Sequence, residues 1–246
     1  MTYTITIENK TGDANQAFSY IAFGFPHPTS AIRGGNGLPV VFYQSRLLND
    51  EEPASFTISE EVYGFLGNSS QTNATLTYGA IATLTKPLAV TLGGRAGDGT
   101  ELEAKPNATR TSVEFKAAGS KQSSLGTFSI IASNALKENN KNVVGLARKV
   151  DNVQKPVSVF PLHPGQTFEI APVESIYIAR NVNNTPINSL VNPDTFAVKQ
   201  QVDLMPDQPN ITVTNVANAP LPAGAAAPAP GAPSTTSATG FQVSYH

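Results

Sequence analysis

The sequence predicts an all-β protein, and the expected architecture is an antiparallel β-sandwich of the jelly-roll kind. Apolar and polar residues alternate with a period of two in most segments, which is the pattern of strands with one buried face. Turn-forming residues separate these segments into roughly twelve to sixteen short strands at about 8–15-residue spacing, as in a sandwich or barrel. The best helical candidate, residues 134–142, is rich in Asn and is expected to be a loop.

The first quarter of the chain contains four expected strands. Residues 2–7 alternate apolar side chains with threonines, so one face of this strand is expected to be buried. Residues 18–25 form a more continuous apolar run, which indicates a strand buried on both faces. Prolines at positions 26 and 28 end that run, because proline has no backbone N–H to donate. Residues 40–43 and 56–66 are the next two strands.

The strand pattern continues through the rest of the body. Residues 74–84 and 88–92 are expected to be two strands separated by Lys86-Pro87. The sequence Gly97-Asp98-Gly99 predicts a hairpin turn, because Asp and Gly tolerate positive φ. Further strands are expected at residues 113–115, 128–131, 143–150, 157–159, 168–170, 176–178, 196–202 and 211–213.

The chain divides into a β-sandwich body, residues 1–218, and a chemically different C-terminal part. Segments 39–62 and 156–176 share a strand–turn–strand pattern. The body is therefore either two packed β halves, 1–118 and 119–218, or one sandwich in which such patterns recur. A chain of 246 residues is long enough for both arrangements and needs no disulfide to stabilise its core.

Residues 219–239 form an arm rich in Pro, Ala, Gly, Ser and Thr, and residues 240–246 return to strand alternation. The composition of the arm provides too little apolar area to offset the entropy cost of ordering it, and it favours polyproline II. The terminal strand is expected either to pack on its own sheet or to be exchanged with another chain. The second alternative predicts a homo-oligomer formed through residues 219–246.

The bulk composition argues against several classes of partner. Lys and Arg total 16 against 18 Asp and Glu, and the cations are scattered, which argues against nucleic acid. The absence of cysteine removes disulfides, thiolate metal sites and cysteine nucleophiles, and we expect neither a cofactor nor a metal. No apolar run reaches the ~18 residues of a transmembrane helix. With no signal peptide visible, the expected location is the cytoplasm, and secretion by a non-classical route is the alternative.

Two histidines lie between prolines, in stiff loops. These are His27 in Pro26-His27-Pro28 and His163 in Leu162-His163-Pro164. Each imidazole could act as a general base or a ligand, and the alternative for each is an exposed loop histidine without a chemical role. No nucleophile motif of the G-x-S-x-G kind accompanies them.

Two Tyr–Arg pairs share a Y-x-x-R spacing. Tyr43 with Arg46 and Tyr177 with Arg180 each place the tyrosine in an apolar strand and the arginine near the end of that strand. A hydroxyl and a guanidinium in that position could bind a carbonyl or a carboxylate. In the alternative interpretation the tyrosine packs its ring and the arginine pairs with an acid.

The N-terminal segment ending in Asn-Lys-Thr-Gly and the sequence Gly-Gln-Thr-Phe-Glu-Ile-Ala-Pro at 165–172 resemble small fungal and bacterial β-sandwich proteins. This resemblance implies the fold class and supplies no catalytic residue.

The sequence favours a non-catalytic binding or assembly protein that uses its C-terminal arm and the loop rim of the sandwich. The alternative is a cofactor-independent isomerase or cyclase that acts on an apolar small molecule in a sandwich or barrel cavity. Its candidate residues are His27, Tyr43, Arg46, His163, Tyr177 and Arg180. A pore-forming protein, suggested by the Thr-rich stretch 74–92, and a lectin are further alternatives.

Overall fold

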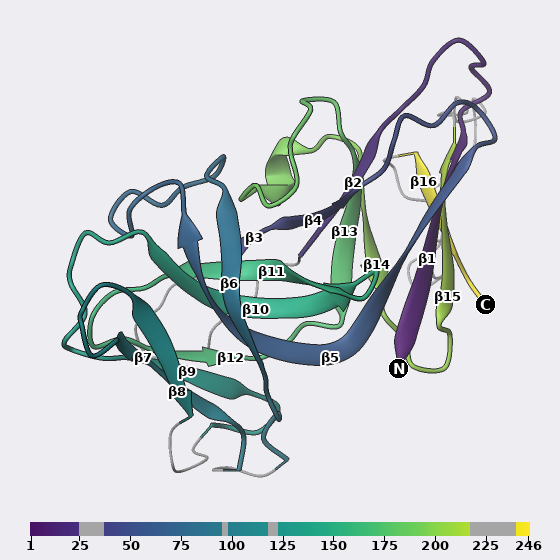
Figure 1. The fold of residues 1–246 in the computed structure, drawn as a ribbon. Coiled ribbons are helices and arrows are strands. Elements are labelled where there is room, and N and C mark those ends of the chain that lie inside the picture. The colour runs from purple at the N-terminus through teal and green to yellow at the C-terminus, as the bar shows by residue number, and fades with distance from the viewer. Residues whose placement is uncertain (25–36, 95–97, 118–122, 217–239) are drawn as a thin grey trace, which may run out of the picture.

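The computed structural model describes residues 1–24, 37–94, 98–117, 123–216 and 240–246 (Figure 1). These residues form strands and one 3-10 helix, η1 (Pro193–Thr195), which confirms the predicted all-β class. The strands are β1 (Thr2–Lys10), β2 (Tyr20–Gly24), β3 (Leu38–Pro39), β4 (Val41–Gln44), β5 (Pro53–Ser69), β6 (Ala82–Ala89), β7 (Glu101–Pro106), β8 (Val113–Ala117), β9 (Phe128–Ala132), β10 (Asn142–Val150), β11 (Val153–Pro161), β12 (Thr167–Ile170), β13 (Ser175–Arg180), β14 (Lys199–Asp203), β15 (Asn210–Val216) and β16 (Phe241–Tyr245).

The described strands form three sheets. The largest has the order β16-β15-β1-β5-β10-β11-β3, with β6 also paired to β5, and the two smaller sheets have the orders β12-β9-β7-β8 and β14-β13-β2-β4. β5 is 17 residues long, and Figure 1 shows it bending as it crosses the molecule. Its first half pairs with β1, and its second half pairs with β10 on one edge and β6 on the other. β5 therefore belongs to two sandwich-like regions.

Two hydrophobic cores lie between this large sheet and the smaller sheets, and a third cluster, which includes Phe65, Val143 and Val159, packs on the opposite face of β5, β10 and β11 from the second core. The first core lies between the β16-β15-β1 end and the β14-β13-β2-β4 sheet, and includes Tyr3, Ile5, Phe56, Ile178, Val213 and Phe241. The second core lies between β5-β10-β11 and the β12-β9-β7-β8 sheet, and includes Leu66, Leu102, Phe128, Val144, Phe160 and Phe168. β10 contributes Val144 to the second core and Val150 to the first, and β11 contributes Phe160 to the second and Val157 to the first, because each strand is long enough to reach both cores.

Strands from the two expected halves share one sheet. β5 pairs with β10 across the boundary between residues 118 and 119, and β1 pairs in parallel with β15. The first core also takes side chains from both ranges, for example Tyr3 and Val213. The body is thus held together by pairing between segments far apart in the sequence.

The expected strands at 74–84 and 88–92 are wrong. Residues 74–79 form turns, and β6 runs through Lys86-Pro87 without a break. Among the described strands β6 pairs only with β5, so it is an edge strand, where proline is tolerated because the outer backbone groups have no partner. A bulge accompanies Pro87: Thr85 is left out of the register, and its hydroxyl donates to the Leu66 carbonyl at 2.9 Å. The Thr-rich stretch therefore does not form a hairpin.

Candidate functional site

Strand β16 completes one edge of the large sheet. Its five residues pair antiparallel with β15 of the same chain. Where β16 begins, the N–H of Val216 donates to the Gly240 carbonyl at 2.7 Å, and where it ends, Asn210 and His246 exchange two backbone hydrogen bonds. β15 is its one hydrogen-bonded strand neighbour in the part of the chain that the structure describes.

The side chains of β16 close the first core. Phe241 is fully buried, and its ring lies edge-to-face with that of Tyr20 at a centroid distance of 6.2 Å. Val243 and Tyr245 pack on the same core. The Tyr245 hydroxyl accepts a 3.3 Å hydrogen bond from the Asp203 N–H, which links β16 to β14 of the facing sheet. β16 thus contacts both layers of this sandwich.

A buried polar cluster lies beside the start of β16. Oδ1 of Asn215, which is fully buried, accepts a 2.7 Å hydrogen bond from Nη2 of Arg180. Nδ2 of Asn215 donates to the Tyr20 hydroxyl at 2.6 Å, and the Arg180 guanidinium lies 4.5 Å from the centroid of the Phe18 ring. Burial raises the pKa of Tyr20, although the Asn215 hydrogen bond and the Arg180 charge oppose this shift. The cluster gives the Asn215 amide two buried partners, whereas Nε of Arg180 is buried without a hydrogen-bond partner among the described residues.

The two side chains of the first predicted Tyr–Arg pair contact different partners in the structure. Tyr43 stacks on Phe56 at a centroid distance of 4.2 Å and packs on the first core, and burial raises the pKa of its hydroxyl. Arg46 is exposed and pairs with Glu52 through a 2.7 Å contact. This arrangement matches the alternative interpretation of a packed ring and a paired arginine.

The second pair also separates. Tyr177 lies 5.4 Å from the ring centroid of Phe23 on the outer face of the β14-β13-β2-β4 sheet, where burial raises its pKa. Arg180 belongs to the polar cluster described above. Tyr43 and Tyr177 face opposite sides of this sheet, because Tyr43 is opposite Ala22 whereas Tyr177 is opposite Phe23.

The His163 side chain contacts neither Tyr–Arg pair in the contacts that the structure describes. His163 is at the far end of the second core, with Nδ1 3.2 Å from Nδ2 of Asn73 and 3.8 Å from Oε2 of Glu138. His27 lies outside the described residues. The five described candidates are thus spread over three regions, and none of them lines either of the two pockets described next.

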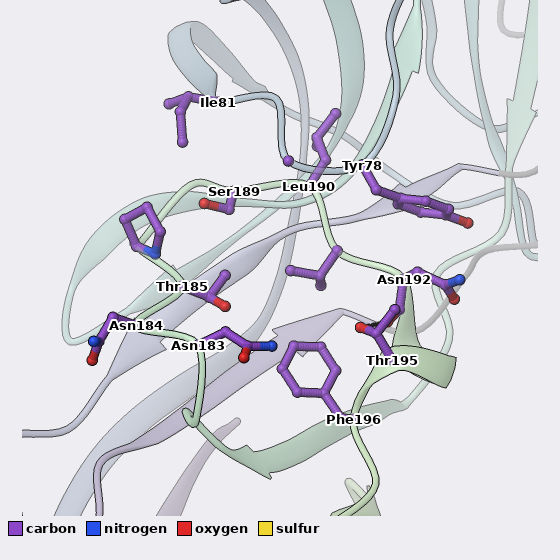
Figure 2. Close-up of a pocket in the computed structure, with 13 residues that line it drawn as sticks. Tyr78, Ile81, Asn183, Asn184, Thr185, Ser189, Leu190, Asn192, Thr195 and Phe196 are labelled. Carbon is purple, nitrogen blue, oxygen red and sulfur yellow. Dashed lines mark hydrogen bonds between the residues drawn. The ribbon is translucent and has the colours of Figure 1, made fainter.

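One pocket of about 400 Å³ lies between the 78–81 segment and the 183–196 segment (Figure 2). Its apolar lining comes from Tyr78, Ile81, Pro186, Leu190, Val191 and Phe196. Its polar side chains are Asn183, Asn184, Thr185, Ser189, Asn192 and Thr195. No charged side chain is among the lining residues.

A second pocket of about 340 Å³ lies between the β7–β8 connection and the 135–142 segment. Arg110 and Lys137 are in its lining, and both are exposed. Within the residues described by the structure, no three His, Asp or Glu side chains are placed to hold a metal ion. No helix there has the length and apolar character needed to cross a membrane.

Sequence reasoning missed Asn215 and the residues of the larger pocket. Asn215 has a local signal: it continues the inward-facing series Ile211, Val213, so a polar residue appears at a core position of the strand. The pocket has no such signal, because Tyr78 and Phe196 come from segments more than a hundred residues apart.

Comparison with protein families, with curated proteins and with solved structures finds no match to this chain.

Proposed function

We propose that this chain is a non-catalytic assembly protein whose copies associate by exchanging strand β16. The observation that carries the proposal is the burial of Phe241 in the first core by a strand joined to that core through a 23-residue connection, residues 217–239. A β-hairpin needs only two to five connecting residues. The covalent connection is therefore much longer than the pairing of β15 with β16 requires.

Exchange preserves every contact of the strand. A β16 from a second copy can make the same backbone hydrogen bonds with β15, fill the same site with Phe241 and reach Asp203 with Tyr245. Both copies then have complete cores, and the only changes in free energy come from the connection and from association. In both arrangements β15 has a hydrogen-bonded strand on each side, β1 on one and a β16 on the other.

The connection weakens the preference for pairing within one chain. Closing 23 residues instead of about four costs roughly 1.5 kcal/mol more in chain entropy. The composition of residues 219–239, which includes no charged residue, favours extended polyproline II, whereas the two ends that it joins are hydrogen-bonded to each other at Val216 and Gly240. A composition that favours extended chain opposes the return of the connection to its own start and so favours pairing with another copy.

The alternative of a cofactor-independent enzyme needs its six candidate residues to converge on one cavity. Tyr43 and Tyr177 lie on opposite faces of one sheet, which argues against a shared cavity. Strand exchange is therefore the better supported of the two proposals.

Light scattering on two versions of the chain tests the proposal. In the control, Asn-Gly replaces residues 217–239, which joins the hydrogen-bonded pair Val216 and Gly240 by a two-residue turn and fixes β16 within its own chain. The mass of the full chain is expected to rise from 25.8 kDa toward twice that value as the concentration approaches the order of 1 mM. The control should stay monomeric. Equal masses for the two proteins at every concentration would contradict the proposal.

A further inference from the structure

We propose that the pocket between Tyr78 and Phe196 binds a neutral saccharide. This site is separate from strand exchange and does not depend on it. Figure 2 shows the lining side chains of the 183–196 segment together with Tyr78 and Ile81. Its volume of about 400 Å³ is within the usual range of about 300–1,000 Å³ for small-molecule sites.

The absence of charged side chains from the lining disfavours ionic ligands. None of the thirteen lining residues has a charged side chain. Asp194 is close in sequence to three of them, but it is outside the lining, and its carboxylate pairs with Nζ of Lys199 at 3.3 Å. An anion or cation entering the pocket would lose hydration without gaining a partner of opposite charge. The ligand is therefore neutral.

The polar side chains select against a purely apolar ligand. Amides at Asn183 and Asn184 and the hydroxyls of Thr185 and Ser189 supply both donors and acceptors. An apolar ligand would displace water from these groups and leave them without hydrogen bonds. The ligand therefore carries several hydroxyl or carbonyl groups.

The remaining surface is apolar and partly aromatic. Phe196, Leu190 and Val191 are buried and form part of the lining, whereas 49% of Tyr78 is exposed at the rim. The Phe196 ring stacks on Phe23 at a centroid distance of 5.1 Å, so the accessible ring is that of Tyr78. A sugar ring has hydroxyls at its edge and C–H groups on its faces, so it can contact the amides and the Tyr78 ring at the same time. Neutral saccharides combine these properties in a ligand that fits this volume.

The polar part of the site is held in place before any ligand arrives. Asn181 is buried and fixes the loop with two hydrogen bonds to the backbone of Thr185, at 2.7 and 3.1 Å. Asn184 adopts a positive φ of 50°, which Asn tolerates better than most residues. Oδ1 of Asn192, another lining residue, caps η1 by accepting from the Asp194 N–H at 3.0 Å, which fixes the orientation of the Asn192 amide. A loop ordered in advance loses less entropy on binding.

Saturation-transfer difference NMR tests the proposal with four probes: D-glucose, D-galactose, D-mannose and N-acetyl-D-glucosamine. The full chain is expected to give difference signals with at least one of them. The double variant Tyr78→Ala/Asn183→Ala should lose at least tenfold in affinity for that sugar, because the rim ring and one amide are removed. Both side chains are exposed, so the fold should be retained.

The matched control is Asn68→Ala, which removes an equally exposed amide at the end of β5, outside the pocket. Its sugar signals should equal those of the parent chain. The absence of signal from all four sugars, or signals that persist unchanged in the double variant, would overturn the proposal. A peptide of residues 219–233 that displaced the bound sugar with higher affinity would also overturn it, because the pocket would then be a site for extended proline-rich chain.

Discussion

Nη2 of Arg180 donates a 2.7 Å hydrogen bond to Oδ1 of Asn215, and this contact joins the two layers of the first sandwich where β16 begins. Arg180 ends β13 in one sheet, whereas Asn215 belongs to β15 in the other. Asn215 is also the register partner of Phe241. The buried amide therefore links the facing sheet to the strand that accepts β16.

Replacing Asn215 with Leu should destabilise the protein by about 2–3 kcal/mol, because Arg180 and the Tyr20 hydroxyl both lose a buried partner. Urea denaturation measures this change. The control is Asn215→Asp, which keeps an acceptor for Arg180 and can accept from Tyr20, so it should lose less than half as much. Equal losses for Leu and Asp would contradict the assigned role of the amide.

Phe241→Ala should destabilise the chain by about 3–5 kcal/mol, because it leaves a cavity beside Tyr20 in the first core. Phe241→Leu retains most of the apolar volume and should cost about 1–1.5 kcal/mol. Thermal or urea unfolding distinguishes the two. If Phe241→Ala lost no stability, β16 would not be part of the core in solution.

The Arg148 side chain is only 2% exposed and lies at the junction between the two cores, with Nη2 2.7 Å from Oε1 of Glu174. Glu174→Ala should cost about 2–4 kcal/mol, because the buried guanidinium loses its counter-ion. Arg148→Met should stay within about 1 kcal/mol of the parent, since Glu174 is half-exposed and regains water. Denaturant unfolding measures both, and a larger loss for Arg148→Met than for Glu174→Ala would refute this account.

Stability should fall at alkaline pH. Burial raises the pKa of Tyr20, Tyr43 and Tyr245 above the usual 10.0, so the folded state holds their protons more tightly than the unfolded state. Their contribution to stability is complete below pH 10 and is lost as pH rises from there through the raised values. The part of the phenolate absorbance that belongs to these three tyrosines should therefore appear together with loss of near-ultraviolet circular dichroism. Ionisation of all seven tyrosines near pH 10 with the fold intact would contradict the prediction.

Alternation along single strands made the fold class predictable. In β1 the apolar positions Tyr3, Ile5 and Ile7 are all buried, as the period of two requires. The length of β5 was not predictable in the same way, because Glu60 and Glu61 interrupt the apolar pattern where the strand passes from one core to the other. The predicted strand break at Pro87 was wrong for a related reason. Whether a proline ends a strand depends on whether that strand is at an edge, which is a property of the whole sheet.

The pairing of the strands could not be predicted from the sequence, because it depends on contacts between distant segments. β1 lies between β5 and β15, about 50 and 200 residues away along the chain, and no local pattern specifies either neighbour. The pocket is hidden for the same reason. In the sequence, Asn183 and Thr185 are typical of an ordinary turn. Only the folded chain brings them to the same pocket as Tyr78 and Phe196.

Disulfide trapping tests strand exchange most directly, since the chain has no cysteine of its own. Thr214 and Gln242 are opposite one another on the outer face of β15 and β16, at a spacing that a disulfide can bridge. Two single-cysteine proteins, Thr214→Cys and Gln242→Cys, are mixed at high concentration, unfolded and refolded together, and then oxidised. Thr83→Cys on the distant β6 replaces Thr214→Cys in the control mixture.

Strand exchange predicts a covalent heterodimer of Thr214→Cys with Gln242→Cys, and much less cross-linking in the control. If the Thr214→Cys mixture gives no more heterodimer than the control, β16 stays with its own chain and the proposed assembly is contradicted.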